Sequence, residues 1–162
     1  MTVPGAIALG NAGQLAGLVL AQLKREGAPI IRTGNGGATF DMRWMIDSYN
    51  APDAGTFGWD LSHHYGLPML AAGGFSDSVL FDAQAAAEAA LSLFAAATAG
   101  ANLIIESGYL DCCTTGSLEL VATCDELISW IRCHLRGQLE ISEETLALDV
   151  IPIVGLQIVQ AA

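Results

Sequence analysis

The chain has few basic residues and few charges of either sign. Its 162 residues include only six Lys and Arg against 17 Asp and Glu, so the formal net charge is −11, and charged residues make up 14%. Proteins that bind nucleic acid need clusters of Lys and Arg to neutralise phosphates. The composition therefore argues against a nucleic-acid partner, and it suits a basic protein or a cationic ligand instead.

A disulfide framework and a metal-binding spacing are missing as well. The cysteines are Cys112, Cys113, Cys124 and Cys133. Adjacent cysteines do not readily share one tetrahedral zinc site, and a chain of this length needs no disulfides to fold. We expect reduced thiols and no metal site.

Segments that would direct the chain to a membrane are also not evident. The alanine-rich residues 83–99 come closest to a membrane-spanning run, but Gln84, Glu88 and Ser92 interrupt them. The N-terminus lacks the basic residues of a signal peptide. We expect a cytoplasmic protein.

What the sequence does contain is a high hydrophobic fraction, 52%, arranged in alternating short and long apolar segments. The short segments predict strands and the longer ones, with helical spacing, predict helices. The predicted strands are residues 6–9, 29–33, 67–72 and 102–106. The predicted helices are residues 12–26, 57–65, 83–98 and 117–136, followed by a last helix from Ser142. A long loop over residues 34–56 interrupts this alternation.

The alternation predicts an α/β fold built from four consecutive βα units. The predicted strands begin 23, 38 and 35 residues apart, and an eight-unit parallel barrel of about 250 residues uses about 31 per unit. We therefore expect a partial TIM barrel, a half-barrel with an added C-terminal helix. A small doubly wound sheet is the alternative, and it is disfavoured because no Gly-x-Gly-x-x-Gly follows any predicted strand.

Two polar loops follow the third and fourth predicted strands. Residues 73–78, GGFSDS, precede a helix that Asp82 can cap, and Glu106 ends the strand before Ser107 and Gly108. In repeated βα proteins, loops at the carboxyl ends of strands form the active site. This pair of loops is the candidate site.

Over residues 6–155 the chain resembles the trimethylamine methyltransferase family, which has a TIM-barrel fold. The resemblance depends on short motifs that occur in order along almost the whole chain. They are residues 11–27, Gly66-Leu-Pro, Gly73-Gly-Phe-Ser-Asp-Ser with Asp82-Ala-Gln-Ala, Ala99-Gly-Ala-Asn-Leu-Ile, Gly108-Tyr-Leu, Thr115-Gly-Ser-Leu-Glu and Thr145-Leu-Ala-Leu-Asp-Val-Ile. The match indicates the C-terminal half of a family domain over residues 1–155, with residues 156–162 as an unrelated tail.

The resemblance implies transfer of a methyl group from a methylated amine to a cob(I)alamin corrinoid held by a partner protein. Family members that act on trimethylamine use pyrrolysine, and others use quaternary amines such as glycine betaine. Pyrrolysine does not occur in this chain, so a quaternary amine is the expected substrate. We assign catalytic roles to Glu106 and Asp77. The expected substrate-binding residues are Asn11, Asn35, Asp41, Arg43, Phe75 and Tyr109.

Each of these residues also has a plainer interpretation. Asp77 and Asp82 can simply cap a turn and a helix, and Phe75 and Tyr109 can be packing residues. Glu106 is harder to explain as structural, because a carboxylate that closes a buried strand needs a partner or a ligand. The alternative for the whole chain is a non-catalytic half-barrel that forms a homo-oligomer or pairs with a missing N-terminal half.

Overall fold

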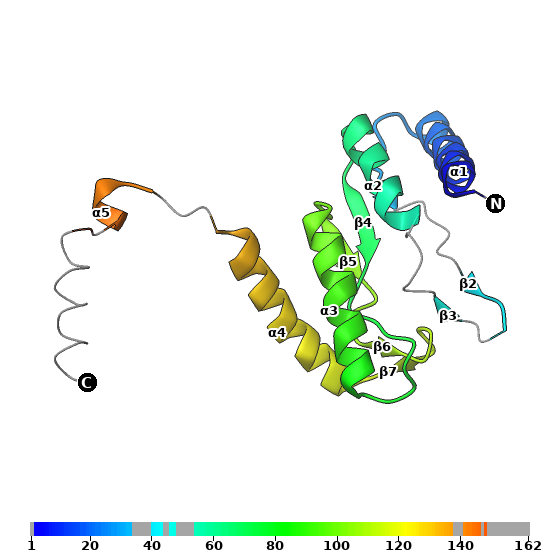
Figure 1. Ribbon diagram of the computed structural model, residues 1–162. Coiled ribbons are helices and arrows are strands. Elements are labelled where there is room, and N and C mark those ends of the chain that lie inside the picture. The colour runs from blue at the N-terminus through cyan, green and yellow to red at the C-terminus, as the bar shows by residue number, and fades with distance from the viewer. Residues whose placement is uncertain are drawn as a thin grey trace, which may run out of the picture. The chain divides into compact units, whose positions relative to one another are not determined.

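A computed structural model describes residues 2–33, 40–43, 46–47, 54–137, 141–146 and 148. The chain divides into two compact units, Met1–Arg132 and Cys133–Ala162. The first unit contains the parallel sheet, its covering helices and the candidate site (Figure 1). The second unit contains the end of helix α4 (Leu118–Leu135) and the one-turn helix α5 (Glu143–Leu146). The start of α5 after Ser142 was predicted correctly. The predicted tail, residues 156–162, lies outside the described residues.

The first element is a long helix, α1 (Val3–Lys24), and the predicted strand over residues 6–9 is wrong. Thr2 caps the helix by accepting a hydrogen bond from the Gly5 amide at 3.3 Å, and proline fits the first helical turn because its missing N–H has no helical partner there. A four-residue apolar run does not distinguish a strand from part of a helix. Asn11 therefore lies within a helix and does not follow a strand.

Helix α1 is also the segment of the described chain that is long and apolar enough to cross a membrane, judged by length and composition only. Its first charged residue is Lys24. None of its residues is buried, and Leu20 and Leu23 are 68% and 80% exposed. The segment closest to membrane-spanning character is thus α1, and not the alanine-rich helix over residues 83–98 as predicted.

The central sheet consists of β1 (Arg32–Thr33), β4 (Met69–Ala72) and β5 (Leu103–Ile105), in that spatial order. Both pairings are parallel, with Thr33 opposite Leu70 and Leu70 opposite Leu103. The second, third and fourth predicted strands therefore lie side by side as expected. The α/β class is confirmed, and the described sheet has three parallel strands instead of four.

Helices α2 (Ala54–Tyr65) and α3 (Ala83–Thr98) follow β1 and β4 along the chain. Asp82 caps α3, as predicted, by accepting a hydrogen bond from the Ala85 amide at 2.9 Å. The backbone leaves α3 through Gly100, whose φ of +80° suits glycine at a helix C-terminus. The sequence located α3 accurately because a cap, an alanine-rich body and a terminal glycine all agree.

Two short antiparallel hairpins were not predicted. One pairs β2 (Phe40–Asp41) with β3 (Ile46–Asp47), and the other pairs β6 (Tyr109–Leu110) with β7 (Thr115–Gly116). The turn of the second hairpin places Asp111, Cys112 and Cys113 at φ values of 53°, 51° and 64°. Residues other than glycine seldom adopt this left-handed conformation, so the turn has little signature in the sequence.

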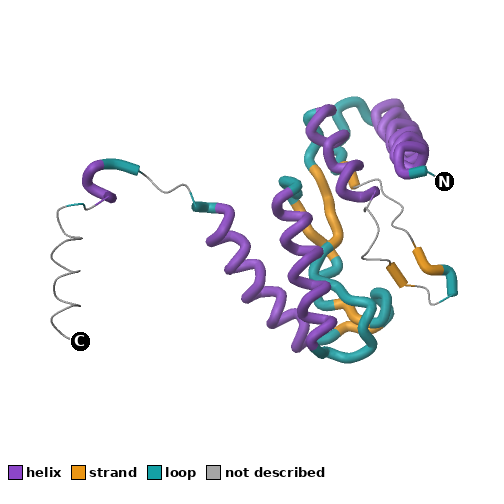
Figure 2. The backbone as a smooth tube through the Cα atoms, in the orientation of Figure 1, coloured by secondary structure: helices purple, strands orange, loops and turns teal. Residues whose placement is uncertain are grey.

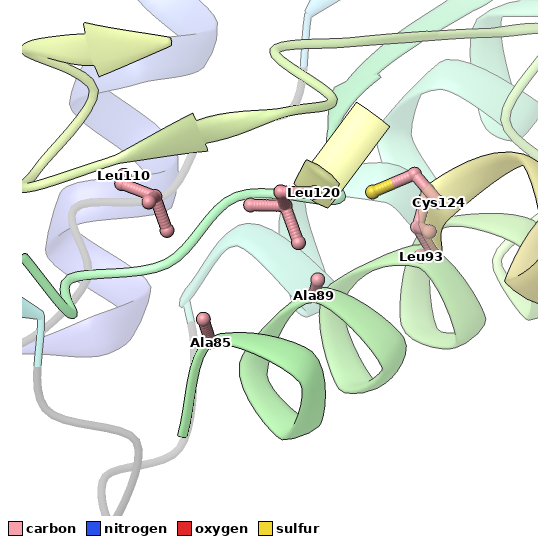
Figure 3. Close-up of a cluster of buried hydrophobic side chains, with 6 residues drawn as sticks. All are labelled: Ala85, Ala89, Leu93, Leu110, Leu120 and Cys124. Atoms are coloured by element: carbon pink, nitrogen blue, oxygen red, sulfur yellow. The ribbon is translucent and has the colours of Figure 1, made fainter. Parts of the chain in front are cut away.

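The hydrophobic core lies on one face of the sheet. Met69, Ala71 and Ile104 pack with Trp59 of α2 and Ala96 of α3. A second cluster joins α3, β6 and α4, and Figure 3 shows its six side chains pointing toward one another. They are Ala85, Ala89, Leu93, Leu110, Leu120 and Cys124.

The other face of the sheet is apolar and open. Strand residues alternate between faces, so Leu70, Ala72, Leu103 and Ile105 point away from the helices. Leu103 and Ile105 are 49% and 40% exposed. Parallel sheets are ordinarily covered on both faces, by helices or by the opposite strands of a barrel. Helices on one face and exposed apolar residues on the other occur both in an open sheet and in a segment of a barrel wall, so the half-barrel stays a prediction.

Candidate functional site

The loops that follow β4 and β5 lie at the same end of the sheet, because both strands run in the same direction (Figure 2). Backbone hydrogen bonds of 2.8–3.0 Å join these loops along their length. They run from Gly73 N to Ile105 O, from Gly108 N to Gly74 O, from Ser76 N to Tyr109 O and from Asp111 N to Ser78 O. The two predicted site loops therefore form one continuous rim.

Gly74 is the point at which this rim is attached to the helices. Its amide donates to Ser92 Oγ of α3 at 3.0 Å, and its carbonyl accepts from the Cys124 thiol of α4 at 3.3 Å. Its φ is +83°, and an added Cβ would lie 2.8 Å from Ser107 Oγ. Only glycine fits here, because both the backbone conformation and the neighbouring atoms exclude a side chain.

Glu88 of α3 anchors the first loop, and it was not among the predicted site residues. Its Oε2 accepts hydrogen bonds from Ser76 Oγ at 2.5 Å and from the Asp77 amide at 3.0 Å. Gln84 Nε2 donates to the other oxygen at 2.9 Å. A hint was present in the sequence, since Glu88 is the one acidic residue within an alanine-rich helix. The carboxylate of Glu88, in the helix that follows this loop, therefore helps to fix the position of Asp77.

Replacing Glu88 by alanine is expected to destabilise the chain by about 1–3 kcal/mol, because the buried Ser76 hydroxyl and the Asp77 amide lose a charged acceptor. Glu88→Gln keeps one acceptor oxygen and is expected to lose less. Urea unfolding measures both, with Gln84→Ala as the control, since it leaves the bonds to Ser76 and Asp77 in place. Equal stability of Glu88→Ala and the unmodified chain would show that the anchor is unimportant.

Cys124 lies in the core directly beneath the rim. Burial raises the pKa of its thiol, and a backbone hydrogen bond with Gly108 partly offsets that shift. Cys124 is 1% exposed, whereas Cys113 and Cys133 are exposed. The buried thiol stays protonated at a pH where an unfolded thiol ionises.

The raised pKa of Cys124 predicts a loss of stability in alkali. Below the ordinary thiol pKa, the folded and unfolded states both hold the proton, and the stabilisation is complete. As the pH rises from that value toward the folded pKa, only the unfolded state loses its proton, so the free energy of unfolding falls by at most about 1.4 kcal/mol per pH unit. Denaturant titrations from about pH 7 to 10 under reducing conditions measure this loss. The decline should be smaller in Cys124→Ala, and an identical decline contradicts the assignment.

Four of the predicted site residues lie on the joined rim. Phe75 and Asp77 belong to the loop after β4 and are partly buried, whereas Glu106 and Tyr109 follow β5 and are exposed. Glu106 has a φ of +73°, an unfavourable conformation for a residue other than glycine. Such strain is often found at functional positions. The structure thus places these four residues on two loops that are hydrogen-bonded to each other, and their individual roles stay predictions.

Asn11, Asp41 and Arg43, which were also predicted as site residues, lie on other elements. Asp41 and Arg43 belong to the β2–β3 hairpin, where Asp41 Oδ1 accepts from the Arg43 amide at 2.8 Å and so closes the turn. Asn35 lies outside the described residues. Asn11, within α1, accepts from the Arg32 guanidinium at 2.9 Å and donates to the Tyr65 hydroxyl at 3.1 Å.

Arg32 is a buried cation on β1, and it had no predicted role. Its Nε donates to Gln14 Oε1 at 2.6 Å, and its guanidinium lies 5.2 Å from the centre of the Tyr65 ring. Burial lowers the pKa of Arg32, while Tyr65 opposes that shift. A cavity of about 230 Å³ adjoins this cluster between α1, β1 and the end of α2. These polar contacts hold α1 beside the sheet.

Within the described ranges, no group of three or more His, Cys, Asp or Glu side chains is placed to hold a metal ion.

Comparison with known proteins gives a consistent family match. Residues 1–157 match the family model described as trimethylamine methyltransferase (MTTB). A trimethylamine methyltransferase of Desulfitobacterium hafniense is 35% identical over 96% of this chain and 32% of its own length. One from Methanosarcina thermophila is 34% identical over 94% and 32%. A glycine betaine methyltransferase of Desulfitobacterium hafniense is 34% identical over 95% and 33%. The chain spans about a third of the length of these relatives.

Proposed function

Because the chain belongs to the trimethylamine methyltransferase family, we propose that it contributes part of the active site of a methyltransferase that acts on a methylated amine. The methyl group passes to a corrinoid carried by a second protein. The observation that supports this function is the joined rim, which gathers an aromatic and a carboxylate residue from each of two neighbouring strands. Phe75 and Asp77 come from one loop, and Glu106 and Tyr109 come from the other.

The rim chemistry favours a quaternary ammonium substrate such as glycine betaine. Aromatic faces and carboxylates attract an alkylated cation, which cannot donate a strong hydrogen bond. Such a substrate leaves as a neutral tertiary amine, so the reaction needs no acid to protonate the leaving group. Relatives named for trimethylamine and for glycine betaine match this chain at nearly equal identity, so the choice depends on the rim chemistry.

A corrinoid acceptor in the Co(I) state would supply the nucleophile that takes up the methyl carbon. The C–N bond breaks at the same time, and its electron pair stays on the nitrogen of the departing amine. Residues of this chain then have two tasks, which are to hold the ammonium in line with the incoming acceptor and to balance its charge. We assign both tasks to Glu106 and Asp77, with Phe75 and Tyr109 as the walls of the substrate site.

The test is methyl transfer to cob(I)alamin, followed by the loss of the Co(I) absorption band. The isolated chain is assayed with glycine betaine and separately with trimethylamine. Transfer from glycine betaine in excess of transfer from trimethylamine is the expected result. Transfer from neither substrate, by a chain that is folded, counts against an active site made by this chain alone and favours the alternative below.

The alternative is a non-catalytic segment of a barrel that associates with complementary βα units or with a second copy. It is favoured by the open apolar face formed by Leu70, Ala72, Leu103 and Ile105, and by the exposed Leu20 and Leu23 of α1. We propose that strands of the rest of a barrel cover this face. Light scattering of the purified chain tests this, and a monodisperse monomer would contradict it, because an open sheet face and open edges favour association.

A further inference from the structure

The turn of the β6–β7 hairpin has two adjacent cysteines, Cys112 and Cys113, as its central residues. The turn is closed by the Thr114 amide, which donates to the Asp111 carbonyl at 3.0 Å. The Thr114 hydroxyl also lies 2.7 Å from Oδ2 of Asp111. These bonds fix the backbone on both sides of the cysteine pair.

Cysteine is an unusual residue for this turn. Cys112 and Cys113 have φ values of 51° and 64°, and turns with positive φ at both central positions are formed mostly by Asn, Asp and Gly. A Cβ in the left-handed region is strained, and strained residues are often found where they serve a function. What Cys-Cys adds, and Asn-Gly would not, is a pair of thiols joined by one peptide bond.

The two thiols differ in accessibility. Cys113 is exposed and Cys112 is partly buried, whereas Cys124 in the core is 1% exposed. Adjacent Cα atoms are about 3.8 Å apart, closer than the roughly 4.4–6.8 Å usual for a disulfide, so a bond between these cysteines is strained. Strained and exposed disulfides are the ones that reducing thiols reopen readily. The pair is therefore suited to a reversible bond and not to a permanent one.

We propose that Cys112 and Cys113 form a reversible disulfide when a peroxide oxidises the chain. The exposed Cys113 thiolate attacks one peroxide oxygen, the O–O bond breaks, and Cys113 becomes a sulfenic acid while one molecule of water is released. The Cys112 sulfur then attacks the Cys113 sulfur and expels the hydroxyl group as a second water. The two thiols together lose two protons and two electrons, and hydrogen peroxide is reduced to two molecules of water.

The oxidation state of this turn is expected to reach the rim. The Asp111 amide, next to Cys112, donates to the Ser78 carbonyl at 3.0 Å and so ties the turn to the loop after β4. A disulfide between adjacent residues closes a small ring around their peptide bond, which changes the backbone angles on both sides of that bond. The tie between Asp111 and Ser78 is therefore weakened in the oxidised chain.

Peptide mass spectrometry tests the bond itself. All chains carry Cys133→Ser, which removes the other exposed thiol. After treatment with hydrogen peroxide, the peptide containing Cys112 and Cys113 should lose two hydrogen atoms, and dithiothreitol should restore both thiols. The matched control adds Cys112→Ser, which leaves Cys113 without a second thiol beside it. Cys113 should then proceed to sulfinic and sulfonic acids, which dithiothreitol does not reverse.

Two results would overturn the proposal. One is the same sulfinic product on Cys113 whether or not Cys112 is present, and the other is a disulfide that joins two chains. Neither measurement involves methyl transfer, so the proposal is independent of the proposed function.

Amide hydrogen exchange, followed by NMR, tests the link to the rim. The Asp111 amide should exchange at least about tenfold faster in the oxidised chain than in the reduced one, since its hydrogen bond opens more often. The Ala85 amide, which donates to Asp82 at the start of α3, is the internal control and should not change. Equal exchange at Asp111 in both states would show that oxidation stays confined to the turn.

Discussion

Replacing Gly108 by alanine is expected to destabilise the chain by about 3 kcal/mol, the sum of a conformational and a packing cost. Gly108 lies between β5 and β6 with a φ of +97°, and an added Cβ would be 2.2 Å from Val121 Cγ2. A side chain in the left-handed region costs about 1–2 kcal/mol, and overpacking adds about 1–3 kcal/mol. The valine has little freedom to move aside, because β-branched side chains in helices prefer one rotamer.

Two further variants separate these causes. Gly108→Ala combined with Val121→Ala removes the clash and leaves the conformational cost, so about half of the lost stability should return. Gly13→Ala lies within α1 with no atom within 4 Å of the added Cβ, and it should stabilise the helix by about 0.5–1 kcal/mol. Urea unfolding compares all three. A Gly108→Ala variant as stable as Gly13→Ala would show that the rim does not pack against Val121 of α4.

The backbone hydrogen bonds of Gly108 explain why one added methyl group should cost so much stability. Gly108 donates to the Gly74 carbonyl, and its own carbonyl accepts from the Ser117 amide at 2.9 Å, just before α4 begins. Displacing Gly108 therefore disturbs the joined loops and the start of α4 together. The same substitution should also move Glu106, two residues away, out of its position on the rim.

The parts of this fold that local signals determine were predicted from the sequence. The strands at residues 69–72 and 103–105 and the helix after Asp82 were predicted because apolar runs, caps and glycines agree there. The meeting of the two loops was also predicted, since neighbouring parallel strands end at the same edge. The prediction of the first βα unit was wrong, because the short apolar run at residues 6–9 fits a helix as well as a strand.

The contacts that hold the site together could not be read from the sequence. Glu88 of α3 reaches Ser76 in the loop before that helix, and Asn11 of α1 reaches Arg32 on the sheet. Both depend on which helix faces which strand, which is a property of tertiary packing. Glu106 was singled out because a carboxylate that closes a buried strand needs a partner, but β5 is largely exposed and so is Glu106. The left-handed backbone of Glu106 is visible only in the structure.

Glu106→Gly gives the second large effect, and it should change stability and activity in opposite directions. Glycine removes the cost of about 1–2 kcal/mol for a side chain at a φ of +73°, and it loses about 0.4–1 kcal/mol through greater freedom of the unfolded chain. The net result is a chain more stable by roughly 0.5–1 kcal/mol. Under the proposed function, kcat/KM for methyl transfer from glycine betaine should fall by about 100-fold or more, because a carboxylate that orients the ammonium is lost.

Cys113→Gly is the matched control, since Cys113 is also exposed and has a φ of 64°. It should gain similar stability and keep its activity. Glu106→Gln keeps the side-chain volume and the backbone conformation, so its activity should fall by a similar factor with little change in stability, and the loss should appear mainly in KM if the carboxylate serves to hold the cation. Full activity in both Glu106 variants would mean that the strained residue only closes the turn after β5, and the catalytic assignment would then pass to Asp77.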